Sequence, residues 1–111
     1  MAIRVLIRRR VPPDKEKKVL ELIKGLRSLA VAQPGYISGE TLRSVADSDA
    51  YLVISNWQTV EDWNAWESSR QRREIQSQID ALLGEETRYE AYYHPQRIGA
   101  RLSGFKGWEG G

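Results

Sequence analysis

The spacing of the apolar residues changes along this chain, and no other feature of the sequence restricts the fold as much. From Ile3 to Arg10 the side chains alternate, which predicts a strand with Ile3 and Ile7 on one face. The same alternation places Arg9 on the opposite face from Arg8 and Arg10. After "VPP" the apolar residues recur about every 3.6 positions, and this period predicts a helix that opens at Pro13 and runs to about Ala32.

The next segment returns to strand spacing. "QPGY" is a turn signal, and "YISGETLRS" and "AYLVISNW" are two predicted strands joined by the polar turn "VADSD". This pattern predicts a β-hairpin. Within the second strand "YLVI" is apolar at four consecutive positions, which indicates a strand buried on both faces.

A second helical segment begins at Thr59, a typical N-cap residue. In one straight helix, a step of about 100° per residue would place Trp66 on the opposite side from Ile75, and one face could not bury both. "SSRQ" has the spacing of a capping box that starts at Ser68. The sequence therefore predicts a break near Ser68 and Ser69, with a new helix after it.

Gly84 ends the predicted helix, and "EETRYEAYYH" predicts a last strand. The order βαββαβ predicts an α+β, ferredoxin-like fold with an antiparallel sheet and helices on one face. Such a chain leaves its other sheet face in water, so the apolar "YLVI" predicts a homodimer that packs through its sheet faces. We expect one domain over residues 1–93 and a Gly-rich tail over residues 94–111, either disordered or docked on the partner.

Composition excludes several kinds of chemistry. The chain has no cysteine and a single histidine, His94, so we expect neither thiol chemistry nor a transition-metal site, and we interpret His94 as a surface residue. The net charge of +2 is too small to favour nucleic acid, and no apolar run approaches the roughly 18 residues of a membrane span. The start "MAIRVLIRRR" lacks a signal-peptide pattern, which predicts a cytoplasmic protein without membrane or nucleic-acid partners.

Three short motifs occur in this topology: "VPPDKEKKVLELIKGL" at the first helix, "PGY" before the hairpin, and "SNWQTVEDWNAW" after it. Together they make residues 2 to 93 resemble the antibiotic biosynthesis monooxygenase (ABM) family of dimeric α+β barrels. Members of this family place a tryptophan at the end of the third strand, here Trp57. They place a tryptophan or histidine nine residues later, here Trp66, and the resemblance implies that these residues line a pocket between helices and sheet.

The family includes cofactor-independent monooxygenases acting on aromatic polyketides, haem-degrading enzymes and members without known activity. The resemblance places Ile7 and Gln76 where the haem-degrading members have an asparagine and a histidine. Isoleucine donates no hydrogen bond, and glutamine is a poor iron ligand beside neutral imidazole. The sequence therefore argues against haem degradation by the family mechanism and favours a site without a cofactor.

Candidate ligand contacts follow from the pocket position. We interpret Trp57 and Trp63 as core residues, and Trp66, at the margin of the apolar stripe, as a pocket wall that Ile7 joins. Asn56 and Gln76 are candidate hydrogen-bond donors, together with Ser55 and the tyrosines of "YEAYY".

A basic group follows the predicted helix break. Arg70, Arg72 and Arg73 could receive a carboxylate or phosphate of a substrate. The alternative, which the charge pattern favours, is a solvated face paired with Glu67 and Glu74.

No nucleophile with an adjacent base, phosphate-binding loop or pair of pocket carboxylates is recognisable in the sequence, so the catalytic residues stay unassigned. The first hypothesis is an ABM-type, cofactor-independent monooxygenase that acts on a small aromatic or apolar substrate. The second is a ligand-binding or interaction dimer of the same fold without catalysis. Haem binding is a third, weaker hypothesis.

Overall fold

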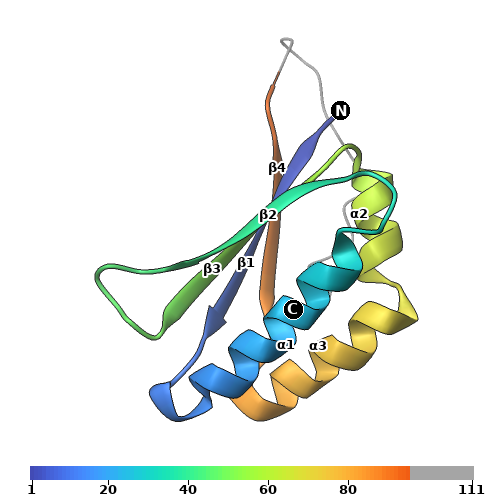
Figure 1. Cartoon of the computed structure of the whole chain (residues 1–111). Coiled ribbons are helices and arrows are strands. Elements are labelled where there is room, and N and C mark those ends of the chain that lie inside the picture. Colours follow the sequence, from blue (N-terminus) through green and yellow to red (C-terminus); the bar gives the residue numbers. More distant parts are fainter. Residues whose placement is uncertain (96–111) are drawn as a thin grey trace.

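The computed structural model describes residues 1–95 of the 111-residue chain, so most of the predicted tail over residues 94–111 lies outside the described residues. The elements are β1 (Ile3–Arg10), a 3₁₀ turn η1 (Pro13–Lys15), α1 (Glu16–Ala30), β2 (Tyr36–Arg43), β3 (Ala50–Trp57), α2 (Val60–Glu67), α3 (Arg70–Leu83) and β4 (Arg88–Tyr93). The sheet order is β2-β3-β1-β4, and all neighbouring strands are antiparallel. The helices lie on one face of the sheet (Figure 1). The predicted ferredoxin-like α+β fold is confirmed.

The predicted helix break is also confirmed. α2 ends at Glu67 and α3 begins at Arg70. The N-cap of α3 is Ser69, whose side chain accepts a hydrogen bond from the Arg72 backbone N–H at 3.3 Å, and not Ser68 as the capping-box spacing predicted. The Ser68 hydroxyl instead donates to the Asn64 carbonyl at 2.9 Å and so closes the end of α2. The break lets each of the two helices bury one of its sides.

Two glycines hold backbone conformations that other residues rarely adopt. Gly84 ends α3 with φ of 71°, as predicted for a C-cap. Gly35 has φ of 81° in the turn before β2, and a Cβ there would overlap the Asp62 carboxylate. The first turn of α2 therefore packs directly on the turn that precedes β2.

The core lies between the helices and the inner face of the sheet. Along β3, Tyr51, Val53, Ser55 and Trp57 are buried and face the helices, since burial alternates strictly along this strand. Trp57 is fully buried, and its indole N–H donates to the Ser55 hydroxyl at 2.7 Å. This strand thus supplies one wall of the space beneath the helices.

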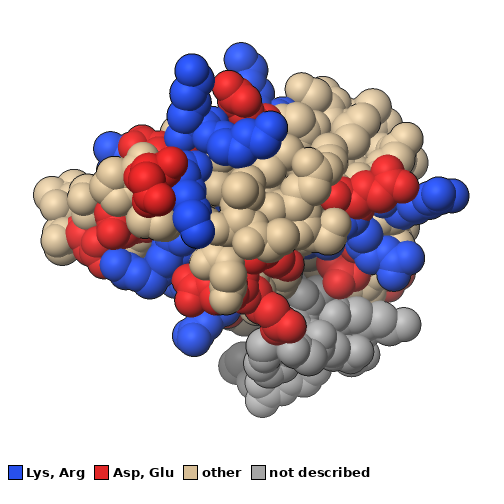
Figure 2. Space-filling view, turned by 90° about the horizontal axis from the view of Figure 1, so that it is seen from below, with Lys and Arg blue, Asp and Glu red and all other residues tan. Residues whose placement is uncertain are grey.

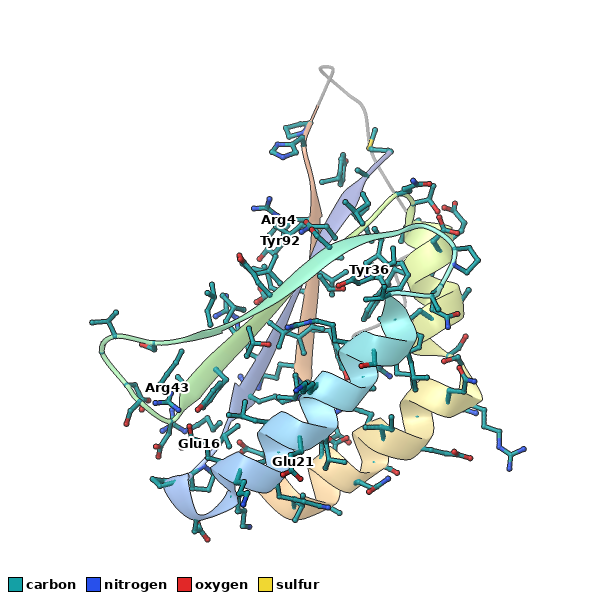
Figure 3. All side chains as sticks on the ribbon, in the orientation of Figure 1. Arg4, Glu16, Glu21, Tyr36, Arg43 and Tyr92 are labelled. Atoms are coloured by element: carbon teal, nitrogen blue, oxygen red, sulfur yellow. The ribbon has the colours of Figure 1, made fainter. Side chains whose placement is uncertain are left out.

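The outer face of the sheet carries apolar side chains that helices do not cover. Leu52 and Ile54 are half-buried within one chain, and Leu42, the register partner of Leu52, is 44% exposed. Arg4 and Tyr92 lie on this helix-free side, whereas Tyr36 lies on the side of the helices (Figure 3). The sheet of a single chain therefore buries "YLVI" on one side only, and its burial on both sides stays a prediction about a second copy.

Within residues 1–95, no helix is long and apolar enough to cross a membrane, and His, Asp and Glu residues form no group of three able to hold a metal ion. Figure 2 shows basic and acidic residues interspersed over the face that it presents. That face has the mixed charge of an ordinary protein surface and not a basic stripe.

Candidate functional site

A cavity of about 50 Å³ lies between the helices and the inner sheet face. β1, α1, β2, β3, α2 and α3 all contribute to it. Its apolar lining comes from Ile7, Ile23, Leu26, Ala30, Val53, Trp63 and Trp66, and its polar lining from Arg9, Arg27, Tyr36, Ser55, Arg72 and Gln76, with Gly39 at the β2 edge. The cavity thus combines an aromatic and aliphatic wall with a group of cationic side chains.

The aromatic wall is a cluster of rings around Trp57. Trp66 stacks on Trp57 with the ring centroids 6.4 Å apart and the planes at 24°. Trp63 and Tyr36 meet Trp57 edge-on, at 6.0 Å and 5.3 Å. Trp57 and Trp63 are fully buried, as expected of core residues, but Trp63 also lines the cavity. Aromatic rings held this tightly form a rigid surface for a flat apolar ligand.

The Trp63 indole N–H has no hydrogen-bond partner. Within the described part of the chain, it is the sole buried side-chain nitrogen or oxygen atom without one. A buried polar group in this state costs free energy and calls for an explanation, such as a water molecule or a ligand acceptor.

Arg9 enters the cavity from the end of β1. It shares the inner face with Ile3, Val5 and Ile7, because residues of one parity along a strand face the same side, and it is only 6% exposed. Its guanidinium donates to the Thr87 hydroxyl at 3.2 Å and to the Gln76 carbonyl oxygen at 2.9 Å. Burial lowers the pKa of Arg9 from its ordinary value to about 10, so Arg9 is still a cation at neutral pH.

Arg72 enters from the first turn of α3 and is also 6% exposed. It donates to the Glu67 carbonyl at 3.1 Å and to the Tyr89 hydroxyl. Its guanidinium carbon lies 5.1 Å from the Tyr89 ring centroid and 5.8 Å from that of Trp63, in cation–π geometry. Burial raises the pKa of the Tyr89 hydroxyl, despite the opposing charges of Arg72 and Arg9, so Tyr89 is neutral at physiological pH.

Three of the residues expected to bind a ligand, Ile7, Trp66 and Gln76, come together in the cavity lining. Gln76 is held there, since its amide nitrogen donates to Asp80 at 2.8 Å and to Thr87 at 2.7 Å. The resemblance had brought these three positions to one site, and the fold places them there.

The other three residues expected to bind a ligand, Asn56, Arg70 and Arg73, do not line the cavity. Asn56 is on the outer sheet face, where it accepts from Arg4 at 3.1 Å and donates to Ser38 at 3.0 Å. Arg70 and Arg73 are exposed, and Arg70 pairs with Glu74 at 3.1 Å, so this part of α3 is the solvated face that the charge pattern favoured. Asn56 follows Ser55 directly in β3. Because successive side chains of a strand point to opposite faces of the sheet, Asn56 lies on the face away from the cavity.

Sequence reasoning left Arg9, Arg27 and Tyr36 out of the site. It named Arg72 together with Arg70 and Arg73 as possible contacts of an anion and favoured a solvated face for all three, which is wrong for Arg72 because Arg72 is buried. The sequence contains signals that Arg9 and Arg72 face the core. Arg9 has the same parity as Ile7 on β1, and Arg72 lies four residues before Gln76 and seven before the buried Ile79, on one helical face. Both signals were hidden by residue type, because arginine is seldom fully buried.

The fold and the partly open cavity define a ferredoxin-like α+β protein with a pocket between its inner sheet face and its helices. The sequence model of the antibiotic biosynthesis monooxygenase family matches residues 2–78 of this chain. The chain belongs to that family.

Solved structures agree on the fold. A conserved protein from Methanosarcina mazei is 22% identical with a TM-score of 0.77, and the match covers 83% of this chain and 91% of that one. A protein from Bacteroides thetaiotaomicron is 24% identical with a TM-score of 0.73, over 82% of this chain and 95% of the other. SnoaB, a cofactor-independent oxygenase from Streptomyces nogalater, is 13% identical with a TM-score of 0.71, over 89% of this chain and 98% of SnoaB. No curated protein matches the sequence.

Proposed function

We propose that this chain binds a small aromatic or apolar molecule beside Trp66 and oxygenates it with dioxygen, without metal or flavin. The observation that carries the proposal is the position of Trp66, whose ring stacks on Trp57 and also lines the cavity between the helices and the sheet. Membership of the ABM family and the fold shared with the oxygenase SnoaB support the same activity.

In such a reaction the substrate supplies the electrons. A ring CH₂ group flanked by electron-rich aromatic rings loses a proton, and the resulting carbanion passes an electron to dioxygen. Recombination gives a peroxide that loses water, so the balanced change is CH₂ + O₂ → C=O + H₂O. The protein has to bind and orient the substrate, exclude water and donate hydrogen bonds to the developing oxygen charge. The arginines and the free Trp63 N–H are donors suited to that task.

The size of the cavity bears on how a substrate enters. About 50 Å³ is less than the roughly 150 Å³ of an apolar cavity that holds benzene. An aromatic substrate that enters the cavity completely therefore has to displace side chains of the wall. Leu26 and Arg27 on α1 are only half-buried, and we propose that they move to admit it.

The test is oxygen uptake by metal-free protein, treated with a chelator, in the presence of an anthrone or hydroquinone compound. We expect oxidised product, and we expect Trp66→Ala to slow its formation. Val45→Ala, in the exposed turn between β2 and β3, is the control and leaves the rate unchanged. A rate in Trp66→Ala equal to that of the wild type would remove Trp66 from the mechanism.

One observation favours the alternative of a ligand-binding dimer without catalysis. Within residues 1–95, neither a histidine nor a carboxylate lines the cavity, so the side chains there include no ordinary base for the substrate proton. Saturable quenching of tryptophan fluorescence by a ligand that yields no product over hours would support this alternative. Haem, the weaker hypothesis, would meet Gln76 already bonded to Arg9 and Asp80, and an unchanged Soret band on titration would dismiss it.

We also propose that two copies pack through their helix-free sheet faces. The apolar side chains Leu6, Leu52 and Ile54 form a continuous row there, since Leu6 pairs with Ile54 in register and Leu52 lies next along the same face. A second copy would bury them together with the exposed Leu42.

A further inference from the structure

The buried arginines of this chain are paired differently from the exposed ones. Four exposed arginines form ion pairs with carboxylates: Arg8 with Glu90, Arg10 with Asp47, Arg43 with Glu16, and Arg70 with Glu74. Arg9 and Arg72 are almost fully buried, yet neither forms an ion pair within the described residues; their hydrogen-bond acceptors are hydroxyl, amide and backbone oxygens. This reverses the usual pattern, because buried charges are the ones that need a countercharge.

Neighbouring groups compensate these two charges incompletely. Asp80 is the acid of this network. Its charge favours the Arg9 cation, but the two side chains are linked by hydrogen bonds through Gln76 and Thr87, which donate to Asp80 at 2.8 Å and 3.0 Å. Tyr89 cannot act as an anion, since burial raises its pKa. Half-buried Arg27 also lines the cavity and donates to the neutral Thr41 hydroxyl at 2.8 Å. The cavity wall therefore holds three guanidinium groups against one indirectly placed carboxylate.

A further donor stands beside these cations. The Trp63 indole N–H is buried without an acceptor, and the ring of Trp63 lies 5.8 Å from the Arg72 guanidinium. The lining of one cavity thus contains an N–H donor without an acceptor and guanidinium groups without an ion pair. Both are relieved by one kind of ligand, a group that is negatively charged and accepts several hydrogen bonds.

The cavity has room for such a group. Its volume of about 50 Å³ exceeds the roughly 10–15 Å³ that one water molecule needs by the same measure, so the two oxygens of a carboxylate can enter it. The planar guanidinium group matches a carboxylate in geometry, with two parallel N–H donors. A ring attached to that carboxylate would lie against the Trp66 side of the cavity.

We infer that the ligand of this cavity is an aromatic carboxylate, whose carboxylate oxygens are received by Arg9 and Arg72 and whose ring packs against Trp66. The inference rests on the proposed function, because it names the substrate class of the same cavity. It adds the requirement that the ligand carries a negative charge, which a purely apolar pocket would not impose.

The test compares two probes of nearly the same shape and different charge, 4-methoxybenzoate and 4-methoxybenzamide. Their affinities are measured by isothermal titration calorimetry at pH 7 under nitrogen. We expect the acid to bind the wild type at least about tenfold more tightly than the amide, since hydrogen bonds to a charged group exceed neutral ones by that order. Arg9→Gln and Arg72→Gln should each remove most of this preference and leave the affinity for the amide within about twofold.

Arg70→Gln is the matched control, because Arg70 lies on the same helix as Arg72 but is exposed and paired with Glu74. It should leave both affinities unchanged. Arg9→Lys and Arg72→Lys keep the charge and should restore part of the preference for the acid. If the glutamine variants fail to fold by circular dichroism, the wild-type comparison and the lysine variants decide the question.

The possible failures are distinguishable. Equal affinities of the wild type for acid and amide would overturn the charge requirement and leave the aromatic pocket of the proposed function in place. Binding of neither probe, together with oxygenation of a neutral anthrone, would also overturn the carboxylate assignment while supporting the oxygenase. Loss of the acid preference in Arg70→Gln as well would place the anion on the surface of α3 and overturn the assignment to Arg9 and Arg72.

Discussion

Trp57 and Trp66 stack with their ring centroids 6.4 Å apart, although one ends β3 and the other lies near the end of α2. Thr59 makes this possible by capping α2 directly after the strand, with its hydroxyl accepting from the Asp62 N–H at 3.0 Å. Trp57 is fully buried and does not line the cavity, whereas part of the Trp66 side chain lines it. The nine-residue spacing thus joins a core residue to a residue of the site.

Substitution by phenylalanine should separate the two roles. Trp57→Phe loses the hydrogen bond to Ser55 and leaves a void in the core, and we expect it to lower the free energy of unfolding by about 2–3 kcal/mol. Trp66→Phe should cost less, about 1 kcal/mol, and enlarge the cavity so that ligand affinity changes at least severalfold. Urea unfolding and ligand titration of both variants measure this. Unchanged ligand affinity in Trp66→Phe would speak against its place in the binding wall.

The break between α2 and α3 predicts a difference between two adjacent serines. Ser69→Ala removes the N-cap of α3 and should lower the free energy of unfolding by about 1 kcal/mol. Ser68→Ala removes only exposed hydrogen bonds back to the carbonyls of Asn64 and Ala65, and it should change the free energy of unfolding by less than about 0.5 kcal/mol, which makes it the control. Chemical unfolding measures both, and equal losses would contradict the assignment of the cap to Ser69.

These two serines also show how far the sequence carries the fold. The mismatch in phase between Trp66 and Ile75 was sufficient to predict the break, because a rigid helical period allows no other solution. It was insufficient to choose the cap, since Ser68 and Ser69 have similar capping propensity and only the chain direction after Glu67 selects Ser69.

The site was less predictable than the fold. The resemblance located Ile7, Trp66 and Gln76. Arg9 and Arg72 share strand parity and helix face with residues of the core, but arginine is ordinarily assigned to the surface because burying its charge is costly. The departure from that rule is what marks these two positions as functional candidates.

The helix-free sheet face leads to a prediction about assembly. Ile54 is half-buried in one chain, and a second copy on this face would bury it further. Ile54→Glu would place a charge within that apolar interface, so we expect light scattering at micromolar concentration to give twice the chain mass for the wild type and a single chain mass for the variant. Val45→Glu, in the exposed turn between β2 and β3, should keep the wild-type mass. A wild-type mass of one chain would contradict the dimer.

Binding of the anionic probe should depend on pH through Arg9. The pKa of Arg9 is about 10 because burial lowers it, so Arg9 is protonated below this pH and neutral above it. An anion binds the protonated form more tightly, and the carboxylate of 4-methoxybenzoate is ionised throughout the neutral and alkaline range. Its affinity should therefore be constant from about pH 6 to pH 9 and fall above about pH 10, by up to about tenfold per pH unit.

The neutral amide separates this effect from alkaline loosening of the fold, since its affinity should stay constant over the same range for as long as the protein is folded. Arg9→Lys provides the decisive comparison. The ordinary pKa of lysine, about 10.4, lies roughly two units below that of arginine, and burial lowers it further, so the decline in affinity should move to lower pH by about two units. A profile of Arg9→Lys that coincides with the wild type would show that a group other than Arg9 controls the binding of the carboxylate.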